Sequence, residues 1–233
     1  MKNEEPIVIA IDGTSASGKS TNARLVAKAL GFTYVDTGAM YRTLAWYCGK
    51  SRADVHDPKA VGRICQQWKT KLLSLDGAVR LLVDNYFPEQ EIRTAETSAL
   101  VPHVAAVPKV RDWMKQKQRD CLQFGSLVME GRDIGSNVFP ETNFKFYIDA
   151  ALGARSRRRE ADGVQEDLEA RDKRDSQRAA APLMVPLGAV MVDTSSMTPD
   201  QSSQQIIDEV RRRMGQGEGR NAVSSGDDEI SRA

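Results

Sequence analysis

The length, composition and charge of this chain argue against several classes of protein. Its 233 residues are 40% hydrophobic and 28% charged, which suits one α/β core with an insert rather than two full-sized domains. Lys and Arg total 33 against 32 Asp and Glu, and a net charge of +1 argues against a protein that mainly coats nucleic acid or a membrane. The separated cysteines Cys48, Cys65 and Cys121 favour a reducing compartment. We expect a cytoplasmic monomer without a nucleic-acid or membrane partner.

Short apolar runs alternate with helical patterns along the chain, which implies a parallel sheet with right-handed crossovers. Two strand-like runs flank Asp76-Gly77, a strong hairpin signal, and we expect this hairpin to belong to a small insert rather than to the main sheet. Residues 215–233 carry Gly, Ser and mixed charge and are expected to form a disordered tail. The patterns predict strands over 7–11, 32–36, 71–75, 79–84, 127–129, 144–148 and 189–192, and helices over 20–30, 40–47, 109–124 and from about 198.

A complete phosphate-loop motif follows the first predicted strand. Residues 13–20 fit G-x-x-x-x-G-K-S/T, in which backbone N–H groups point at phosphate oxygens and the next helix adds the positive end of its dipole. Lys19 is expected to bridge the β- and γ-phosphates of ATP, and the Ser20 hydroxyl to ligate Mg²⁺. The predicted ATP-binding residues are Gly13, Thr14, Ser15, Ala16, Ser17, Gly18, Lys19, Ser20 and Thr21.

A phosphate loop does not by itself identify the reaction, because kinases, GTPase switches and motor ATPases all contain one. A GTPase would need N-K-x-D and D-x-x-G, and neither string occurs in this chain. The chain has two histidines, offers no nucleophile–base pair and is rich in arginine, a composition suited to neutralising several phosphates. These features favour phosphoryl transfer to a small acceptor.

Further motifs resemble those of bacterial cytidylate kinases, in the order of that family and from about residue 7 to residue 214. Residues 36–42, DTGAMYR, resemble the family's D-S/T-G-x-x-Y-R, and residues 130–140, EGRDIGSNVFP, resemble its D-G-R-D-x-G-x-x-V-F-P. The segments 91–94 and 104–111 are similar to the family's monophosphate-binding insert, and 171–178 with 181–183 to its lid. Together these matches are specific.

The resemblance implies a fold and an activity. The fold would be of the P-loop NTPase type, with a five-stranded parallel sheet flanked by helices. The kinase domain would span 1–214, with a monophosphate-binding insert at about 37–108 and a lid at about 150–180. The implied reaction is ATP with CMP or dCMP giving ADP and the diphosphate, with Mg²⁺ as cofactor, in pyrimidine metabolism.

The resemblance also implies roles for single residues. Catalytic candidates are Lys19, Arg132, Arg158 and Arg171, the last two in the lid. The acceptor phosphate is expected to contact Arg42, Arg132 and Arg178, the cytosine edge Arg111 and Asp133, and the sugar Asp175. The remaining substrate-binding candidates are Asp36, Thr37 and Glu130. By contrast, Arg155 and Arg157 are interpreted as solvated charges on a helix face.

Two positions depart from the family's pattern. Glu130 stands where the family usually has Asp, and Pro102 where many members place a small hydroxyl residue near the base. Base selection is then expected to depend on Arg111 and Asp133. The alternatives are a phosphate-loop kinase that uses UMP or another small molecule, and an ATP-binding module without catalytic activity.

Overall fold

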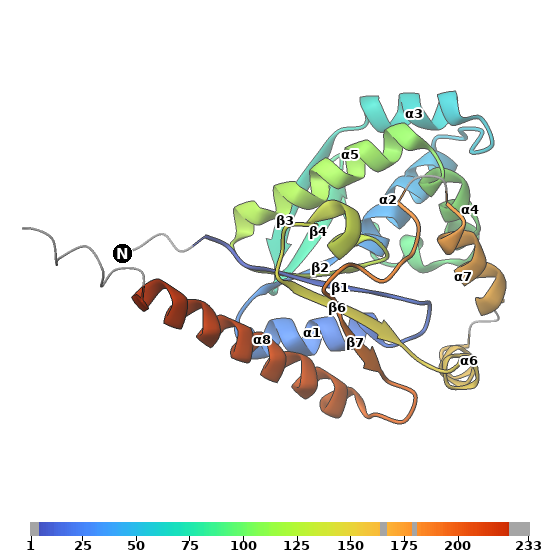
Figure 1. Cartoon of the computed structure of the whole chain (residues 1–233). Helices are drawn as coiled ribbons and strands as arrows, with labels where there is room; N and C mark the ends of the chain where they lie inside the picture. Colours follow the sequence, from blue (N-terminus) through green and yellow to red (C-terminus); the bar gives the residue numbers. More distant parts are fainter. Residues whose placement is uncertain (1–4, 164–166, 179–180, 224–233) are drawn as a thin grey trace, which may run out of the picture.

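One mixed sheet organises the part of the chain that the computed structural model describes, residues 5–163, 167–178 and 181–223, with side chains as far as residue 215. Its seven strands lie in the order β3-β4-β2-β5-β1-β6-β7 (Figure 1). Their bounds are β1 Val8–Gly13, β2 Thr33–Asp36, β3 Thr70–Leu75, β4 Ala78–Val83, β5 Leu127–Gly131, β6 Phe144–Asp149 and β7 Val190–Asp193.

The predicted five-strand count is wrong, because the hairpin β3–β4 belongs to the main sheet. Strands β2, β5, β1, β6 and β7 form the expected parallel core. Tyr34 of β2 pairs in parallel with Ala78 of β4, and β3 pairs antiparallel with β4. Asp76 and Gly77 form the tight turn with φ of 51° and 71°. Since that turn directly precedes Ala78, it brings the hairpin against the edge of β2.

The helices confirm most of the predicted elements and add several that the pattern did not predict. Helices α3 and α4 were not predicted, and the charged segment between β6 and β7 contains α6 and α7. Helix α8 continues through residues 215–223 of the expected tail, and the rest of that segment lies outside the described residues. The bounds are α1 Lys19–Leu30, α2 Thr37–Lys50, α3 Pro58–Gln67, α4 Ala95–Ala105, α5 Pro108–Arg119, α6 Leu152–Ala161, α7 Leu168–Ser176 and α8 Pro199–Val223, with short turns η1 Glu91–Arg93, η2 Asp120–Phe124 and η3 Ile134–Val138.

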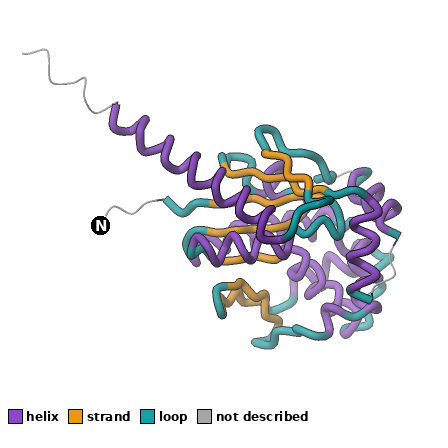
Figure 2. The backbone as a smooth tube through the Cα atoms, turned by 90° about the horizontal axis from the view of Figure 1, so that it is seen from below, coloured by secondary structure: helices purple, strands orange, loops and turns teal. Residues whose placement is uncertain are grey.

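Each face of the sheet has its own hydrophobic core, because alternate residues of a strand point to opposite faces. In β1, Val8 and Ala10 pack on the side of α2 to α5, whereas Ile9 and Ile11 pack on the side of α1 and α8. Helix α8 runs along the sheet, and its C-terminal part projects beyond it (Figure 2). None of the described helices is both long and apolar enough to cross a membrane.

The carboxyl ends of the parallel strands meet at one edge of the sheet. Strands β1 and β6 both point toward α6 and α7 (Figure 1). The segments that follow β1, β2, β5 and β6 therefore lie close together, and such an edge is where open α/β sheets bind ligands.

Candidate active site

The phosphate loop follows β1 and requires glycine at both of its ends. A Cβ on Gly13 would lie 1.9 Å from the carbonyl oxygen of Ile148, so a side chain there is excluded. Gly18 has a φ of 91° and begins α1 without a side-chain cap in the described structure. The first N–H groups of α1 are consequently left to an anion.

Lys19 is a buried cation inside this loop. It is 5% exposed, and its Nζ donates to the Thr14 carbonyl oxygen and to Ser17 Oγ. Burial, together with the neighbouring positive charges of Arg132 and Arg171, lowers the pKa of Lys19 well below its usual range. A bound phosphate would reverse this effect, because its negative charge favours the ammonium form.

Ser20 and Glu130 place a hydroxyl and a carboxylate beside the loop. The Ser20 hydroxyl lies near enough to Glu130 to favour the ionised form of that carboxyl, and the Tyr34 hydroxyl donates to Glu130 Oε1 at 3.0 Å. Burial raises the pKa of Glu130, and the nearby Asp36 charge adds to this. Asp36 accepts from the Ala39 N–H and caps α2, while the Thr37 hydroxyl donates to the Glu130 carbonyl oxygen at 2.7 Å.

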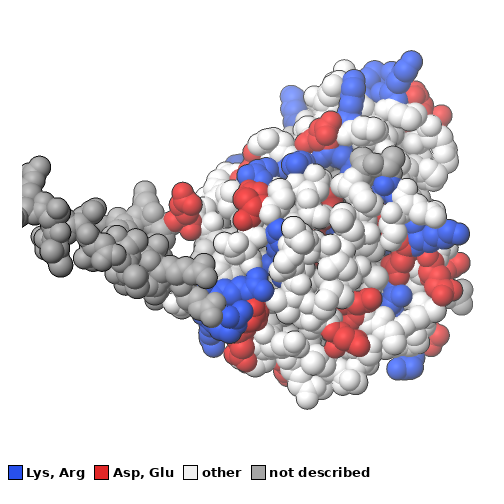
Figure 3. Space-filling model, in the orientation of Figure 1, with Lys and Arg blue, Asp and Glu red and all other residues white. Residues whose placement is uncertain are grey.

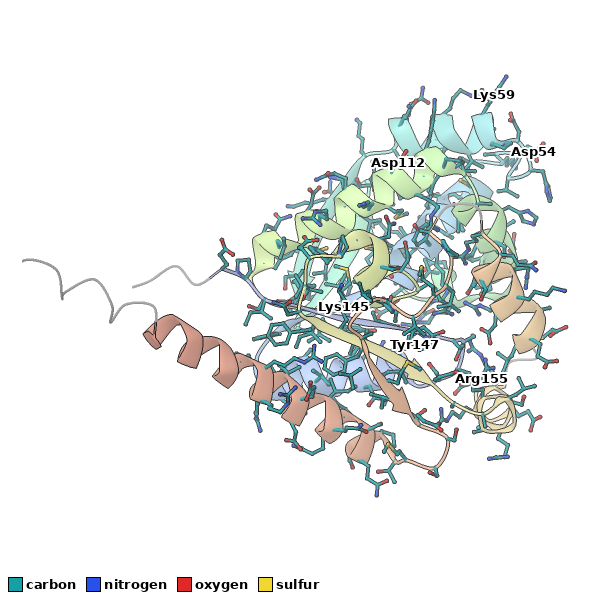
Figure 4. All side chains as sticks on the ribbon, in the orientation of Figure 1. Asp54, Lys59, Asp112, Lys145, Tyr147 and Arg155 are labelled. Atoms are coloured by element: carbon teal, nitrogen blue, oxygen red, sulfur yellow. The ribbon has the colours of Figure 1, made fainter. Side chains whose placement is uncertain are left out.

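The interpretation of Arg155 as a solvated charge is wrong. This side chain is 8% exposed, and its Nε donates to the Ala150 carbonyl oxygen at 2.9 Å (Figure 4). Its Nη1 pairs with Asp172 and donates to the Ser15 carbonyl oxygen. Asp172 also accepts from the Ser15 N–H at 3.1 Å. Arg155 and Asp172 thus hold α6, α7 and the phosphate loop together.

The predicted Arg158 and Arg171, and Arg159, which was not predicted, lie beside the same loop. Arg158 donates from Nη1 to the Ala16 carbonyl oxygen at 3.2 Å and from Nη2 to the Thr194 carbonyl oxygen at 2.6 Å. Arg159 donates to Ser15 Oγ at 3.2 Å. Arg171 lies near enough to Lys19 for its charge to act on that ammonium group. Helices α6 and α7, which lie far from the loop in the sequence, therefore surround it with arginine side chains.

Arg111 and Asp133 form a buried ion pair on the other side of β1. Arg111 Nη2 and Asp133 Oδ2 are 2.8 Å apart. The Asn137 side-chain amide donates to the same Oδ2 at 2.9 Å. Arg111 also lies over the ring of Tyr41. Asp133 Oδ1 is the carboxylate atom that these contacts leave open.

A second acidic group joins two more of the predicted arginines. Asp175 Oδ2 lies 2.9 Å from Arg132 Nε, and Asp175 Oδ1 pairs with Arg178. Burial lowers the pKa of Arg178, and the charges of Arg111 and Arg132 add to this effect. The two ion-pair clusters therefore lie within electrostatic reach of each other.

Arg42 differs from these arginines. The structure gives it no hydrogen bond or ion pair among the described residues, although a Cβ added to Gly38 would lie 3.5 Å from its Nη1. The described residues also contain no group of three or more His, Cys, Asp or Glu side chains placed to hold a metal ion.

Comparison with known proteins extends the resemblance to most of the chain. The family model described as cytidylate kinase matches residues 9–212. The chain is 36% identical over 217 residues to the cytidylate kinase of Caldanaerobacter subterraneus subsp. tengcongensis, covering 88% of this chain and 95% of that one. It is 38% identical to the cytidylate kinase of Symbiobacterium thermophilum, covering 88% and 96%.

One similar relative is a longer protein. The chain is 35% identical over 231 residues to the bifunctional pantoate ligase/cytidylate kinase of Trichormus variabilis. This match covers 93% of the chain but 43% of that relative.

Proposed function

Because the chain belongs to the cytidylate kinase family, we propose that it transfers the γ-phosphoryl group of ATP to CMP, and also to dCMP, giving ADP and the nucleoside diphosphate. The observation that carries this proposal is that a phosphate loop and a buried Arg111–Asp133 pair face the same edge of the sheet. The first suits the donor, and the second suits the base of the acceptor.

On the donor side, ATP would bind with its phosphates in the loop of residues 13–20. Lys19 contacts the β- and γ-phosphates, and Arg158 and Arg171 approach the same group from the lid helices. The N–H groups at the start of α1 add donors that do not have to reorganise during transfer. Buried positive charge of this kind stabilises the transferring group.

On the acceptor side, the phosphate of CMP would bind Arg42, Arg132 and Arg178. A monophosphate is largely ionised at neutral pH, so the attacking oxygen needs no strong general base. Catalysis therefore consists of holding the acceptor oxygen in line with the γ-phosphate while arginines neutralise the charge. Asp175 keeps Arg132 and Arg178 side by side and lies where the sugar hydroxyls would bind.

Cytosine would be selected by the Arg111–Asp133 pair. It presents an N4 amine donor, whereas uracil presents an O4 acceptor at the same edge. Arg111 and Asn137 both contact Asp133 Oδ2, so Oδ1 is the atom that would accept from N4. The guanidinium of Arg111 would donate to N3 of cytosine, but uracil carries a hydrogen there.

Mg²⁺ fits the oxygen atoms beside the loop. Ser20 and Glu130 supply a neighbouring hydroxyl and carboxylate, the hard oxygen ligands that Mg²⁺ accepts together with phosphate oxygens. When bound with ATP, the ion would neutralise charge on the β- and γ-phosphates.

We assign the protein to the cytoplasm as a monomer in pyrimidine nucleotide metabolism.

The proposal is tested by incubating the purified chain with ATP, CMP and MgCl₂ and separating the nucleotides by anion-exchange chromatography. We expect CDP and ADP to form in equal amounts, and chelation of Mg²⁺ by EDTA to stop both. Release of ADP without CDP, or no release of ADP, would contradict the proposal.

A further inference from the structure

Asp12 is a buried carboxylate to which the proposed reaction gives no task. It lies in β1, directly before the first glycine of the phosphate loop, and is 0% exposed. A buried carboxylate is strongly disfavoured unless its oxygens are hydrogen-bonded. Its partners therefore indicate what it does.

Both carboxylate oxygens of Asp12 bind the backbone that follows β5. Oδ1 accepts from the Ile134 N–H and Oδ2 from the Gly135 N–H, each at 2.8 Å. These two amides are separated from Asp12 by more than 120 residues and begin the turn η3. The contact thus joins the strand that leads into the donor loop to a segment on the acceptor side.

The segment held in this way directly follows Arg132 and Asp133. The turn η3 also bonds back to Asp133, because the N–H groups of Asn137 and Val138 donate to its carbonyl oxygen at 2.9 and 3.1 Å. Asp12 therefore fixes the backbone next to two proposed acceptor-binding side chains, without itself reaching the place where the acceptor would bind.

The burial of this carboxylate is unfavourable by itself, and its hydrogen bonds only partly offset the loss of hydration. Burial raises the pKa of Asp12 to about 7, although the two N–H bonds and the charge of Lys19 favour the ionised form. An apolar residue at this position would avoid the desolvation penalty but would leave two buried N–H groups unpaired.

We propose that Asp12 is a positioning residue that sets the distance between the donor phosphate loop and the acceptor-binding residues Arg132 and Asp133. This inference rests on the proposed function, since it takes the acceptor to be the ligand of that segment. Transfer requires reacting atoms within about 3–3.5 Å of each other, so a small displacement of one side slows it strongly.

The test replaces Asp12 by Asn, which keeps the shape of the side chain but exchanges one carboxylate oxygen for an amide NH2 group. This group cannot accept the hydrogen bond from the backbone N–H that faces it. We expect the KM for CMP to rise about tenfold and kcat to fall about tenfold, whereas the dissociation constant of ATP, measured alone by calorimetry, changes less than threefold. Thermal unfolding of the variant shows whether it is folded.

Asp149→Asn is the matched control, because Asp149 is a carboxylate at the end of the neighbouring strand β6. Its Oδ1 accepts from the Thr14 hydroxyl at 2.6 Å and from the Ala150 N–H at 2.9 Å, and neither of these contacts involves η3. We expect this variant to weaken ATP binding and to leave the KM for CMP unchanged. If both variants raise the KM for CMP equally, or if Asp12→Asn weakens ATP and CMP equally, the proposal is wrong.

A measurement on the unmodified protein covers the case in which Asp12→Asn does not fold. Hydrogen exchange followed by NMR should find the Ile134 and Gly135 amides protected at least about a hundredfold against unstructured peptide rates. Unprotected amides would overturn the inference. Failure of the proposed function is distinct, because it would appear as a wild type that phosphorylates no nucleoside monophosphate.

Discussion

The donor and acceptor sides of the site are built in different ways. The proposed donor loop is one continuous stretch, residues 13–20, and we expect the backbone N–H groups at the start of α1 to bind phosphate. The acceptor side gathers single side chains from segments that are far apart in the chain. These are Arg42 of α2, Arg111 of α5, Arg132 and Asp133 after β5, and Asp175 and Arg178 in and after α7. A local motif can specify the first kind of site, whereas only the fold can assemble the second.

The arginines on the two sides also have different partners. Arg155 and Arg158 donate to backbone carbonyl oxygens of the loop, and so support its shape. Arg111 and Arg132 pair with carboxylates, which hold each guanidinium in one orientation. Figure 3 shows basic and acidic side chains interspersed over the face of the molecule that is turned to the viewer in Figure 1. Paired arginines are preorganised for a ligand, because little further ordering is needed on binding.

The largest effect is expected on the donor side, from Lys19→Ala. This change removes the ammonium group that we propose to contact the transferring phosphate, so kcat should fall roughly a thousandfold or more. Lys28→Ala, at an exposed position of the same helix, is the control and should keep wild-type kinetics. Coupled assay of ADP release measures both. A Lys19→Ala enzyme with near-normal turnover would show that the loop is wrongly assigned.

The next effect tests the acceptor side through Asp133→Ala. Loss of the carboxylate removes the proposed acceptor for cytosine N4, so a wild-type preference for CMP over UMP of about a hundredfold or more should shrink to within about tenfold. The loss should appear mainly in kcat/KM for CMP. Asp112→Ala is the control, since Asp112 lies exposed on α5 beside Arg111 (Figure 4). Unchanged selectivity in Asp133→Ala would refute the base-reading role.

A smaller effect is expected from a change in the contacts by which helices α6 and α7 support the donor loop. Arg155→Lys keeps the charge but loses the fork that joins Ala150, Ser15 and Asp172. The KM for ATP should rise about tenfold while the KM for CMP changes little. Arg157→Lys, on the exposed face of the same helix, should change neither. Equal KM values for ATP in the two variants would argue against Arg155 as a support of the loop.

The smallest effect concerns the turn of the β3–β4 hairpin, to which we assign no nucleotide contact. Gly77 has a φ of 71° and space around it, so Gly77→Ala should lower the free energy of unfolding by ~1 kcal/mol through backbone strain alone. Gly215→Ala, in helix α8 and without a positive φ, should instead raise it by up to ~1 kcal/mol. Thermal unfolding measures both, and kinetics should be unchanged. A loss of CMP phosphorylation in Gly77→Ala would show that the hairpin is not separate from the site.

The sequence predicts the donor side better than it predicts the lid and the sheet edge. Gly13, Gly18 and Lys19 have the spacing of the phosphate-loop motif, and this motif also specifies the backbone conformation of the loop. By contrast, nothing in the local pattern around Arg155 distinguishes a buried arginine from a solvated one, because its partners Ser15 and Asp172 come from two other segments.

The pairing of the hairpin with the main sheet and the contacts of Asp12 were not predicted, for related physical reasons. Asp76-Gly77 predicts the turn, but the pairing of Ala78 with Tyr34 depends on a long-range register that no turn residue specifies. Asp12 is a charged residue in an otherwise apolar strand, and this indicates that its carboxylate has buried hydrogen-bond partners. Its partners are backbone amides, however, and these carry no sequence signal. The acceptor residues were predicted only through family resemblance, since spacing does not bring Arg111 and Asp133 together.

The most direct test of this account measures kcat/KM of the wild-type protein with ATP and each common nucleoside monophosphate in turn. If the loop holds ATP and the Arg111–Asp133 pair reads the base, CMP and dCMP should be phosphorylated at least about a hundredfold more efficiently than UMP, AMP or GMP. Equal use of CMP and UMP, or a clear preference for a purine nucleotide, would contradict the assignment of the acceptor side.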